Sequence, residues 1–269
     1  MYSGTTFRIK SGLVMGVHQK IDRVARRKLG GLLDDATDFP TISEILHFEG
    51  LNGPDGIKRK SPGKDEPWHF IDPTKPEESK LLELIDNHIN NLARALQAGN
   101  QERAAFEAAW LSHAVTDGLT PAHHYPLEDK LIELRGGEGL DSRSSKRKKV
   151  ILPGDTKLKQ IANNWEFWGA RGVMTTHLGF ELGVASTISS HKFSVEKPDE
   201  DMLAAVKKDG YRRVFINILR EVNSLHMYEA YTKAGWSRKL ARQTRHELMP
   251  FIIEAVCLSW YAAFYGAKK

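Results

Sequence analysis

The sequence has a single cysteine, Cys257, among 269 residues. One cysteine excludes an internal disulfide and is compatible with a reducing compartment. A strong excess of either charge is also missing, because 39 Lys and Arg stand against 34 Asp and Glu, which gives a net charge of +5 and a pI of about 9.1. This mild excess favours anionic ligands but is too small to identify nucleic acid as the partner.

Long uninterrupted apolar runs are also missing. The most apolar stretch, FIIEAVCLSWYAAFYGA, contains Glu254 and is shorter than a membrane span, so we expect a buried helix there and no transmembrane segment. The first twenty residues contain only the short apolar run GLVMGV and lack the pattern of a signal peptide. We therefore expect a cytoplasmic protein with no stable protein partner, and secretion by another route is the alternative.

The hydrophobic periodicity is helical along most of the chain, and no alternating run with hairpin turns indicates a sheet. The sequence predicts one all-α, multi-helix bundle domain over residues 1–269. A leucine and isoleucine stripe over 81–96, closed by Gly99, predicts one helix, and Pro250 is expected to bend the last one. The other expected helices are 13–32, 101–118, 155–169, 172–188, 199–232 and 237–265.

Two segments are expected to be irregular. Residues 50–76 are dense in glycine, proline and charge, which is typical of a long loop. Residues 135–155 form a basic insert that contains the cluster KRKK at 146–149 after Arg143. We favour a solvated loop for this insert, and a clamp on a polyanionic substrate is the alternative.

Histidines and an aspartate gather in AAWLSHAVTDGLTPAHHYP, residues 108–126, which otherwise has the pattern of a buried helix running into a turn. His113 and Asp117 are one helical turn apart, so they share one face. A glycine and a proline then end the helix, so the chain can fold back and present His123. A hydrogen bond between His113 and Asp117 would explain that pair alone, but it would not explain the further histidine.

A second pair at the same spacing is His177 and Glu181, in MTTHLGFELG. Three more candidate ligands are weak evidence one by one. His18 with Asp22 fits a helix-surface pair, and Asp55 in NGPDG fits a turn. His69 in PWHFID is the third, and a lone histidine is more often a hydrogen-bonded core residue than a ligand.

Together these side chains predict a metal site, because imidazole and carboxylate are the ligands that zinc and related ions prefer. No HExxH motif is present, which speaks against a single-zinc protease. No adjacent His-Asp dipeptide is present either, which speaks against an HD-type metal phosphohydrolase. The order His, Asp, His, His-x3-Asp-x5-His, His-x3-Glu over residues 18–181 resembles the zinc-dependent phospholipase C and S1–P1 nuclease family. That resemblance implies an all-α fold and hydrolysis of phosphate esters with a cluster of three zinc ions.

The resemblance also implies an assignment of ligands. One zinc would be bound by Asp55, His69, His113 and Asp117, with Asp117 bridging toward a neighbouring ion. A second would be bound by His123, His177 and Glu181. His124 competes with His123 for its place, which the family spacing gives to His123. His18 and Asp117 would share the third zinc.

The chain departs from the family pattern in two places. Secreted members complete the third site with the amino group and carbonyl of an N-terminal tryptophan, and this chain has no tryptophan before Trp68. We therefore expect two or three zinc ions, with the third site weak, absent or completed by another residue. The basic insert also makes the distance from His123 to His177 longer than in compact phospholipases.

The resemblance implies that zinc ions hold the substrate phosphate and activate a water for in-line attack, with Asp55 binding metal and orienting or deprotonating that water. The final acid, Glu181, matches the phospholipase C branch, so we place a phospholipase C-like phosphodiesterase first. A nuclease for single-stranded nucleic acid comes second, since Trp68, Tyr125, Trp165 and Trp168 are candidates for base stacking. A catalytically silent metal-binding helical protein is the third possibility.

Overall fold

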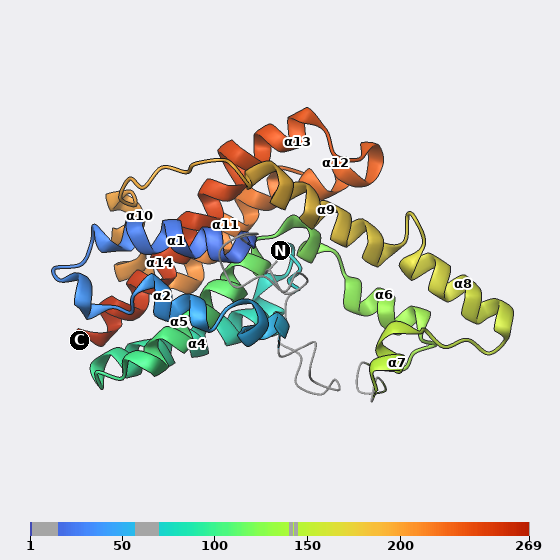
Figure 1. Ribbon diagram of the computed structural model, residues 1–269, viewed down its shortest axis with the longest axis horizontal. Coiled ribbons are helices and arrows are strands. Elements are labelled where there is room, and N and C mark those ends of the chain that lie inside the picture. Colours follow the sequence, from blue (N-terminus) through green and yellow to red (C-terminus); the bar gives the residue numbers. More distant parts are fainter. Residues whose placement is uncertain (2–15, 57–69, 140–141, 143–144, 269) are drawn as a thin grey trace.

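The computed structural model describes residue 1 and residues 16–56, 70–139, 142 and 145–268. These described residues contain helices and no strand, which confirms the all-α fold class (Figure 1). The α-helices are α1 (Val17–Gly30), α2 (Ile42–His47), α4 (Lys80–Gln97), α5 (Gln101–Gly118), α6 (Leu127–Leu134), α7 (Lys146–Val150), α8 (Lys157–Trp168), α9 (Val173–Ile188), α10 (Glu200–Asp209), α11 (Tyr211–Ser224), α12 (Met227–Ala234), α13 (Arg238–Gln243) and α14 (Met249–Ala267). Shorter turns are the 3-10 helices η1 (Ala36–Asp38), η2 (Gly50–Asn52), η3 (Pro76–Glu78) and η4 (Pro121–His124), and the π turn η6 (Thr244–Leu248).

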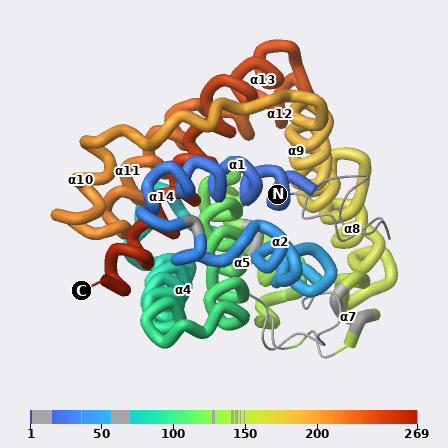
Figure 2. Tube along the Cα trace, turned by 60° about the vertical axis from the view of Figure 1, so that its left-hand side comes forward, coloured from blue at the N-terminus to red at the C-terminus, as the bar shows by residue number. Residues whose placement is uncertain are grey.

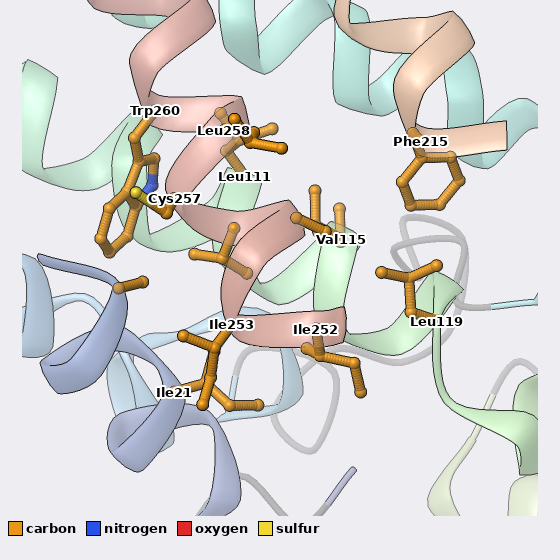
Figure 3. Close-up of a cluster of buried hydrophobic side chains, with 14 of the residues drawn as sticks. Ile21, Leu111, Val115, Leu119, Phe215, Ile252, Ile253, Cys257, Leu258 and Trp260 are labelled. Carbon is orange, nitrogen blue, oxygen red and sulfur yellow. The ribbon is translucent and has the colours of Figure 1, made fainter. Parts of the chain in front are cut away.

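The core is built around α14, which is apolar on nearly every face and packs against α1, α4, α5 and α11. Figure 3 shows Ile253 and Leu258 of α14 among side chains from α1 and α5. The indole Nε1 of Trp260 donates to the Ala108 carbonyl oxygen at 2.9 Å, which ties α14 to α5. By length and composition the helical run 238–267 could cross a membrane, but 72% of its most apolar stretch is buried inside the fold, as in a core helix.

Local sequence signals fix the two ends of α5, the helix that carries His113 and Asp117. Its first residue, Gln101, follows Asn100, whose side chain accepts a hydrogen bond from the Arg103 N–H at 3.0 Å. Its last residue, Gly118, lies so close to Leu81 and Phe215 that a Cβ would come within 2.8 and 2.9 Å of them. Only glycine therefore fits at this position, and η4, which begins at Pro121, follows the end of the helix.

Some expected elements differ from the structure. The helix predicted over 199–232 is three helices, because the chain takes positive φ at Gly210 (83°) and His226 (49°). The irregularity expected at Pro250 is the π turn η6, since proline lacks an N–H and its ring would collide with the preceding turn of an α-helix. The insert 135–155 is not entirely loop, because its basic cluster forms α7.

Helices α6, α7 and α8 lie together at one end of the molecule, away from α14 (Figures 1 and 2). A small separate core holds this end together, formed by Leu131, Leu134, Leu152 and Phe167. Tyr125, Phe70, Val173 and Met174 pack against it. Because α9 then runs back from this end toward the bundle, it carries His177 and Glu181 to the side of η4.

Candidate metal centre

The first candidate metal group joins α1 to α5. His18 of α1 is fully buried, and its ring stacks on that of His113 with the centroids 4.3 Å apart. The Nε2 atom of His18 lies 3.3 Å from Oδ1 of Asp117, and Nε2 of His113 lies 3.3 Å from Oδ2 of the same carboxylate. Two helices distant in sequence therefore place three ligating side chains around one buried point.

The second group joins η4 to α9. Nε2 of His123 and Nε2 of His177 each lie 3.1 Å from Oε1 of Glu181, and the two rings stack with centroids 4.9 Å apart. His124 turns elsewhere, because its Nε2 lies 3.0 Å from the Gly118 carbonyl oxygen. Of the two neighbouring histidines, the structure brings His123 to the group.

Asp117 connects the two groups. Its Oδ2, which faces His113, is also 3.9 Å from Nδ1 of His123. Its Oδ1 faces His18. One carboxylate therefore presents its two oxygens in different directions, which is the arrangement a bridging ligand needs.

Met1 also reaches this centre, and the sequence analysis did not anticipate it. The Met1 ammonium donates to Oδ1 of Asp117 at 2.6 Å and lies 3.3 Å from Oε1 of Glu181, so it spans both groups. The Met1 carbonyl oxygen lies 3.0 Å from Nε2 of His18. The one signal that could have pointed here was the family's use of a main-chain amino group and carbonyl at the third site.

A second layer of carboxylates stands behind the first group. Oε1 of the buried Glu49 lies 3.8 Å from Nδ1 of His113, on the side of the ring away from Asp117. Asp22 is fully buried and accepts a hydrogen bond from the Ser112 hydroxyl, so the alternative in which His18 and Asp22 form a pair on the helix surface is excluded. Glu49 belongs to no periodic pattern in the sequence, which left it without a signal.

The remaining predicted ligands lie at the edge of the centre or outside the described residues. Oδ1 of Asp55 is 3.8 Å from Nε2 of His113, and its side chain is 29% exposed, more than that of any other candidate ligand in the described part of the chain. Asp55 thus adjoins the first group from the side nearest solvent. His69 and Trp68 lie outside the described residues.

The pKa values of the two buried carboxylates, Asp117 and Glu181, are lower than usual. Burial raises the pKa of Asp117, but the Met1 ammonium, His123 and His113 outweigh burial and hold this pKa well below its ordinary value. Burial acts the same way on Glu181, where the Met1 ammonium and His177 keep the pKa well below normal. Both carboxylates are therefore ionised, as metal ligands must be.

The histidines and the Met1 amino group differ in their protonation states. Burial lowers the pKa of His123 to about 4, so this ring is neutral and able to ligate. Burial also disfavours the charged form of His113, but Asp117 outweighs it and raises the His113 pKa well above its ordinary value. Burial opposes charge on the Met1 amino group too, yet Asp117 and Glu181 raise its pKa to about 10. Without metal, protons on His113 and Met1 compensate the buried negative charge.

The donor atoms fit zinc in type and spacing. A tetrahedral zinc with bonds of about 2.0–2.1 Å separates its ligand atoms by about 3.3–3.4 Å. Within the two groups, the four closest histidine–carboxylate separations are 3.1, 3.1, 3.3 and 3.3 Å. Two buried His and acid groups could therefore each hold a metal ion.

Comparisons of the chain with models of known protein families, with curated proteins and with solved structures find no match. The geometry of the two groups must therefore carry the functional argument.

Proposed function

We propose that this protein is a zinc-dependent phosphoric ester hydrolase and, more narrowly, a phospholipase C-like phosphodiesterase. One observation carries the proposal: side chains from α1, α5, η4 and α9 converge into two buried His and acid groups, and Asp117 of the first lies 3.9 Å from His123 of the second. A structural metal site closes all positions with protein ligands, whereas a catalytic site leaves some open. Among the described residues each group offers three side-chain ligands, and in this proposal a remaining position is taken by water or a phosphate oxygen.

The side chains have distinct tasks in this proposal. Asp117 holds the two groups together, while Glu181 fixes His123 and His177 around a second point. Asp55, the most exposed candidate in the described part of the chain, stands where a substrate or an attacking water would enter and would orient that water. Bound zinc would supply Lewis acidity toward the phosphate and lower the pKa of nearby water.

Met1 supports a third metal-binding position in the same cluster. Its amino group and carbonyl oxygen lie beside Asp117 and His18, so together these four groups would hold a third ion in place of the ammonium proton. This part of the proposal requires a free amino group at Met1, so the N-terminal peptide of the protein from its natural source should be identified by mass spectrometry. A free Met1 and a third zinc equivalent are expected. Two equivalents in a protein with free Met1 would contradict the third position.

The main test compares two adjacent histidines. The purified protein should contain at least two zinc equivalents and hydrolyse an activated phosphodiester such as bis(4-nitrophenyl) phosphate. His123→Ala should lose one equivalent and most of the activity, whereas His124→Ala should keep both, because His124 bonds to the main chain instead. Circular dichroism spectra establish that both variants are folded. Metal content near zero in the unmodified protein would contradict the proposal.

The substrate class needs its own comparison. Phosphatidylcholine micelles and single-stranded DNA should be offered to the same zinc-loaded preparation, with phosphate-ester products measured for both. We expect cleavage of the phospholipid, in line with Glu181 as the final acid. Cleavage of the DNA alone would replace the phospholipase with a nuclease while leaving the hydrolase proposal intact.

A further inference from the structure

Helix α8 has its apolar side turned outward. Leu158, Ile161 and Trp165, at spacings of three and four residues, form one stripe on the helix. Their side chains are 79%, 65% and 72% exposed. A surface helix in a globular protein ordinarily turns such a stripe toward the core.

The opposite face of α8 explains why the helix holds this orientation. Asn163 is buried and donates to the carbonyl oxygens of Leu134 and Pro153, both at 2.8 Å. Asn164 exchanges hydrogen bonds with the main chain of Leu152, and Phe167 enters the small core of this end. Specific polar contacts therefore fix α8 with its hydrophobic stripe facing solvent.

The stripe belongs to a larger apolar surface. Eight of the ten exposed large hydrophobic side chains in the described part of the chain fall within residues 150–182. Trp168 continues the stripe on α8, and its Nε1 donates to the Val150 carbonyl oxygen, which joins α7 to α8. Leu178 and Leu182 of α9, the helix that contacts α8, are exposed as well. We name this set the α8 surface: Leu158, Ile161, Trp165, Trp168, Leu178 and Leu182.

Positive charge surrounds the α8 surface. Residues 145–171 contain seven Lys and Arg and two acids, a net charge of +5 that equals the net charge of the whole chain. Arg147, Lys148, Lys157 and Lys159 are exposed. One of the two acids, Glu166, already pairs with Lys130 at 2.7 Å. Residues 145–171 thus combine exposed aliphatic and indole groups with an excess of cations.

We propose that the α8 surface docks on an anionic phospholipid bilayer. Leucine and isoleucine gain free energy by entering hydrocarbon, tryptophan prefers the interface, and lysine and arginine attract acidic headgroups. Both views place α7 and α8 at the end of the molecule, where a flat membrane can reach them (Figures 1 and 2). The docking requires no metal and no hydrolysis, so it stands apart from the proposed function.

Other occupants fit the α8 surface less well. Single-stranded nucleic acid would use the two tryptophans and the cations, but four of the six side chains are aliphatic and offer no ring for stacking. A second copy of the chain, related by a twofold axis, would bring two regions of net charge +5 against each other. A bilayer uses both the aliphatic groups and the cations.

The docking also has a definite relation to the candidate metal centre. Leu178 and Leu182 each follow a candidate ligand directly in α9, since they are the neighbours of His177 and Glu181. Successive residues of a helix point about 100° apart, so the leucines face outward beside the inward-facing ligands. A membrane bound to the α8 surface would therefore lie next to the second metal group.

The test is flotation of the full chain with vesicles of phosphatidylcholine, with and without phosphatidylserine. We expect binding to the mixed vesicles, weakened by salt, and a drop of about tenfold or more in the Leu158→Glu/Ile161→Glu double variant. The matched control is Val195→Glu, which changes an exposed aliphatic residue outside the α8 surface and should bind as the unmodified protein does. Thermal unfolding establishes that all variants are folded.

Three results would overturn the proposal. The first is no binding to the mixed vesicles at low salt, and the second is equal binding by the double variant. The third is that the double variant loses a dimer, seen by analytical ultracentrifugation, or binding to single-stranded DNA, while vesicle binding stays unchanged. Because flotation is measured with and without a zinc chelator, failure of docking is distinguishable from failure of the proposed hydrolysis.

Discussion

Helices α5 and α8 depart from the ordinary surface-helix pattern in opposite directions. Helix α5 is buried on almost every side and carries polar ligands, His113 and Asp117, into the interior. Helix α8 places Asn163 inside and leaves Leu158 and Trp165 in solvent. Ordinary folding energetics favours neither arrangement, since buried charge and exposed apolar area both cost free energy.

The difference between the two helices indicates two kinds of function. A charge buried in α5 is tolerable because several partners surround it, and those partners form a group that could hold a metal ion. The apolar stripe on α8 is exposed within the described part of the molecule, and the proposed bilayer would be the partner that covers it. Sites that break local rules are where function is expected.

The largest expected effect comes from a substitution in the polar centre of α5. Asp117→Asn keeps the size of the side chain but removes the charge shared by both groups, so zinc affinity should fall by roughly a thousandfold, more than the ~10–100-fold loss of a supporting residue. Competition with a chelator measures this affinity. The matched control is Glu107→Gln on the same helix, a fully buried carboxylate paired with His88 and Arg103 instead. Equal zinc affinities in the two variants would contradict the assignment of Asp117.

The same substitution on both helices gives the next largest contrast. Leu111→Ala removes a fully buried side chain of α5 and should lower the free energy of unfolding by about 2–5 kcal/mol. Leu158→Ala on α8 removes a side chain that is 79% exposed and should change it by less than about 0.5 kcal/mol. Urea denaturation measures both. A large loss for Leu158→Ala would mean that α8 packs against something within the chain.

The sequence predicted α5 well because its signals are local. Asn100 and Gly118 mark the two ends, and the predicted bounds 101–118 match the structure. Burial of the C-terminal helix was equally predictable, since it is apolar on nearly every face. The breaks at Gly210 and His226 were missed. Glycine commonly ends a helix, so Gly210 carried a local signal, whereas a histidine with positive φ, as at His226, has none in the sequence.

The candidate site was predictable in its side chains but not in its main-chain and supporting groups. The i, i+4 pairs at 113/117 and 177/181 point inward because the helices holding them are buried on that side. Met1 and Glu49 reach the centre only because of the path that the folded chain takes. No spacing between residues in the sequence predicts that path. The outward stripe of α8 has the same spacing as a core-facing stripe, so sequence alone predicts its helix and misses its direction.

A pH effect tests the charge balance at the centre of α5. In metal-free protein the folded state raises the pKa of the Met1 amino group from 8.0 to about 10. A raised pKa stabilises the fold below the unfolded value, so this contribution is fully present well below pH 8 and is lost as pH rises through 10. The loss between pH 8 and pH 10 is about 2 kcal/mol. Urea denaturation of metal-free protein at pH 8 and pH 10 measures it.

The control for this effect is the same metal-free protein with an acetylated N-terminus, which has no ammonium to titrate. Other groups that change charge over this range are common to both forms, so the difference between the two isolates Met1. Equal losses in both forms would show that the ammonium at Asp117 contributes nothing to stability.

The smallest expected effect concerns the inner face of α8. Asn163→Leu makes this face more apolar, yet it should lower the free energy of unfolding by about 1–2 kcal/mol, because the buried carbonyl oxygens of Leu134 and Pro153 lose their donor. Leu158→Lys, on the outer face, should leave stability unchanged while it weakens vesicle binding. Urea denaturation of the two variants reports the contacts that hold α8 in place, and flotation reports the binding of its outer face to vesicles. If Asn163→Leu stabilised the protein instead, the orientation of α8 would rest on the packing of Phe167 and the Asn164 hydrogen bonds to Leu152, and the outward stripe would not be specified by Asn163.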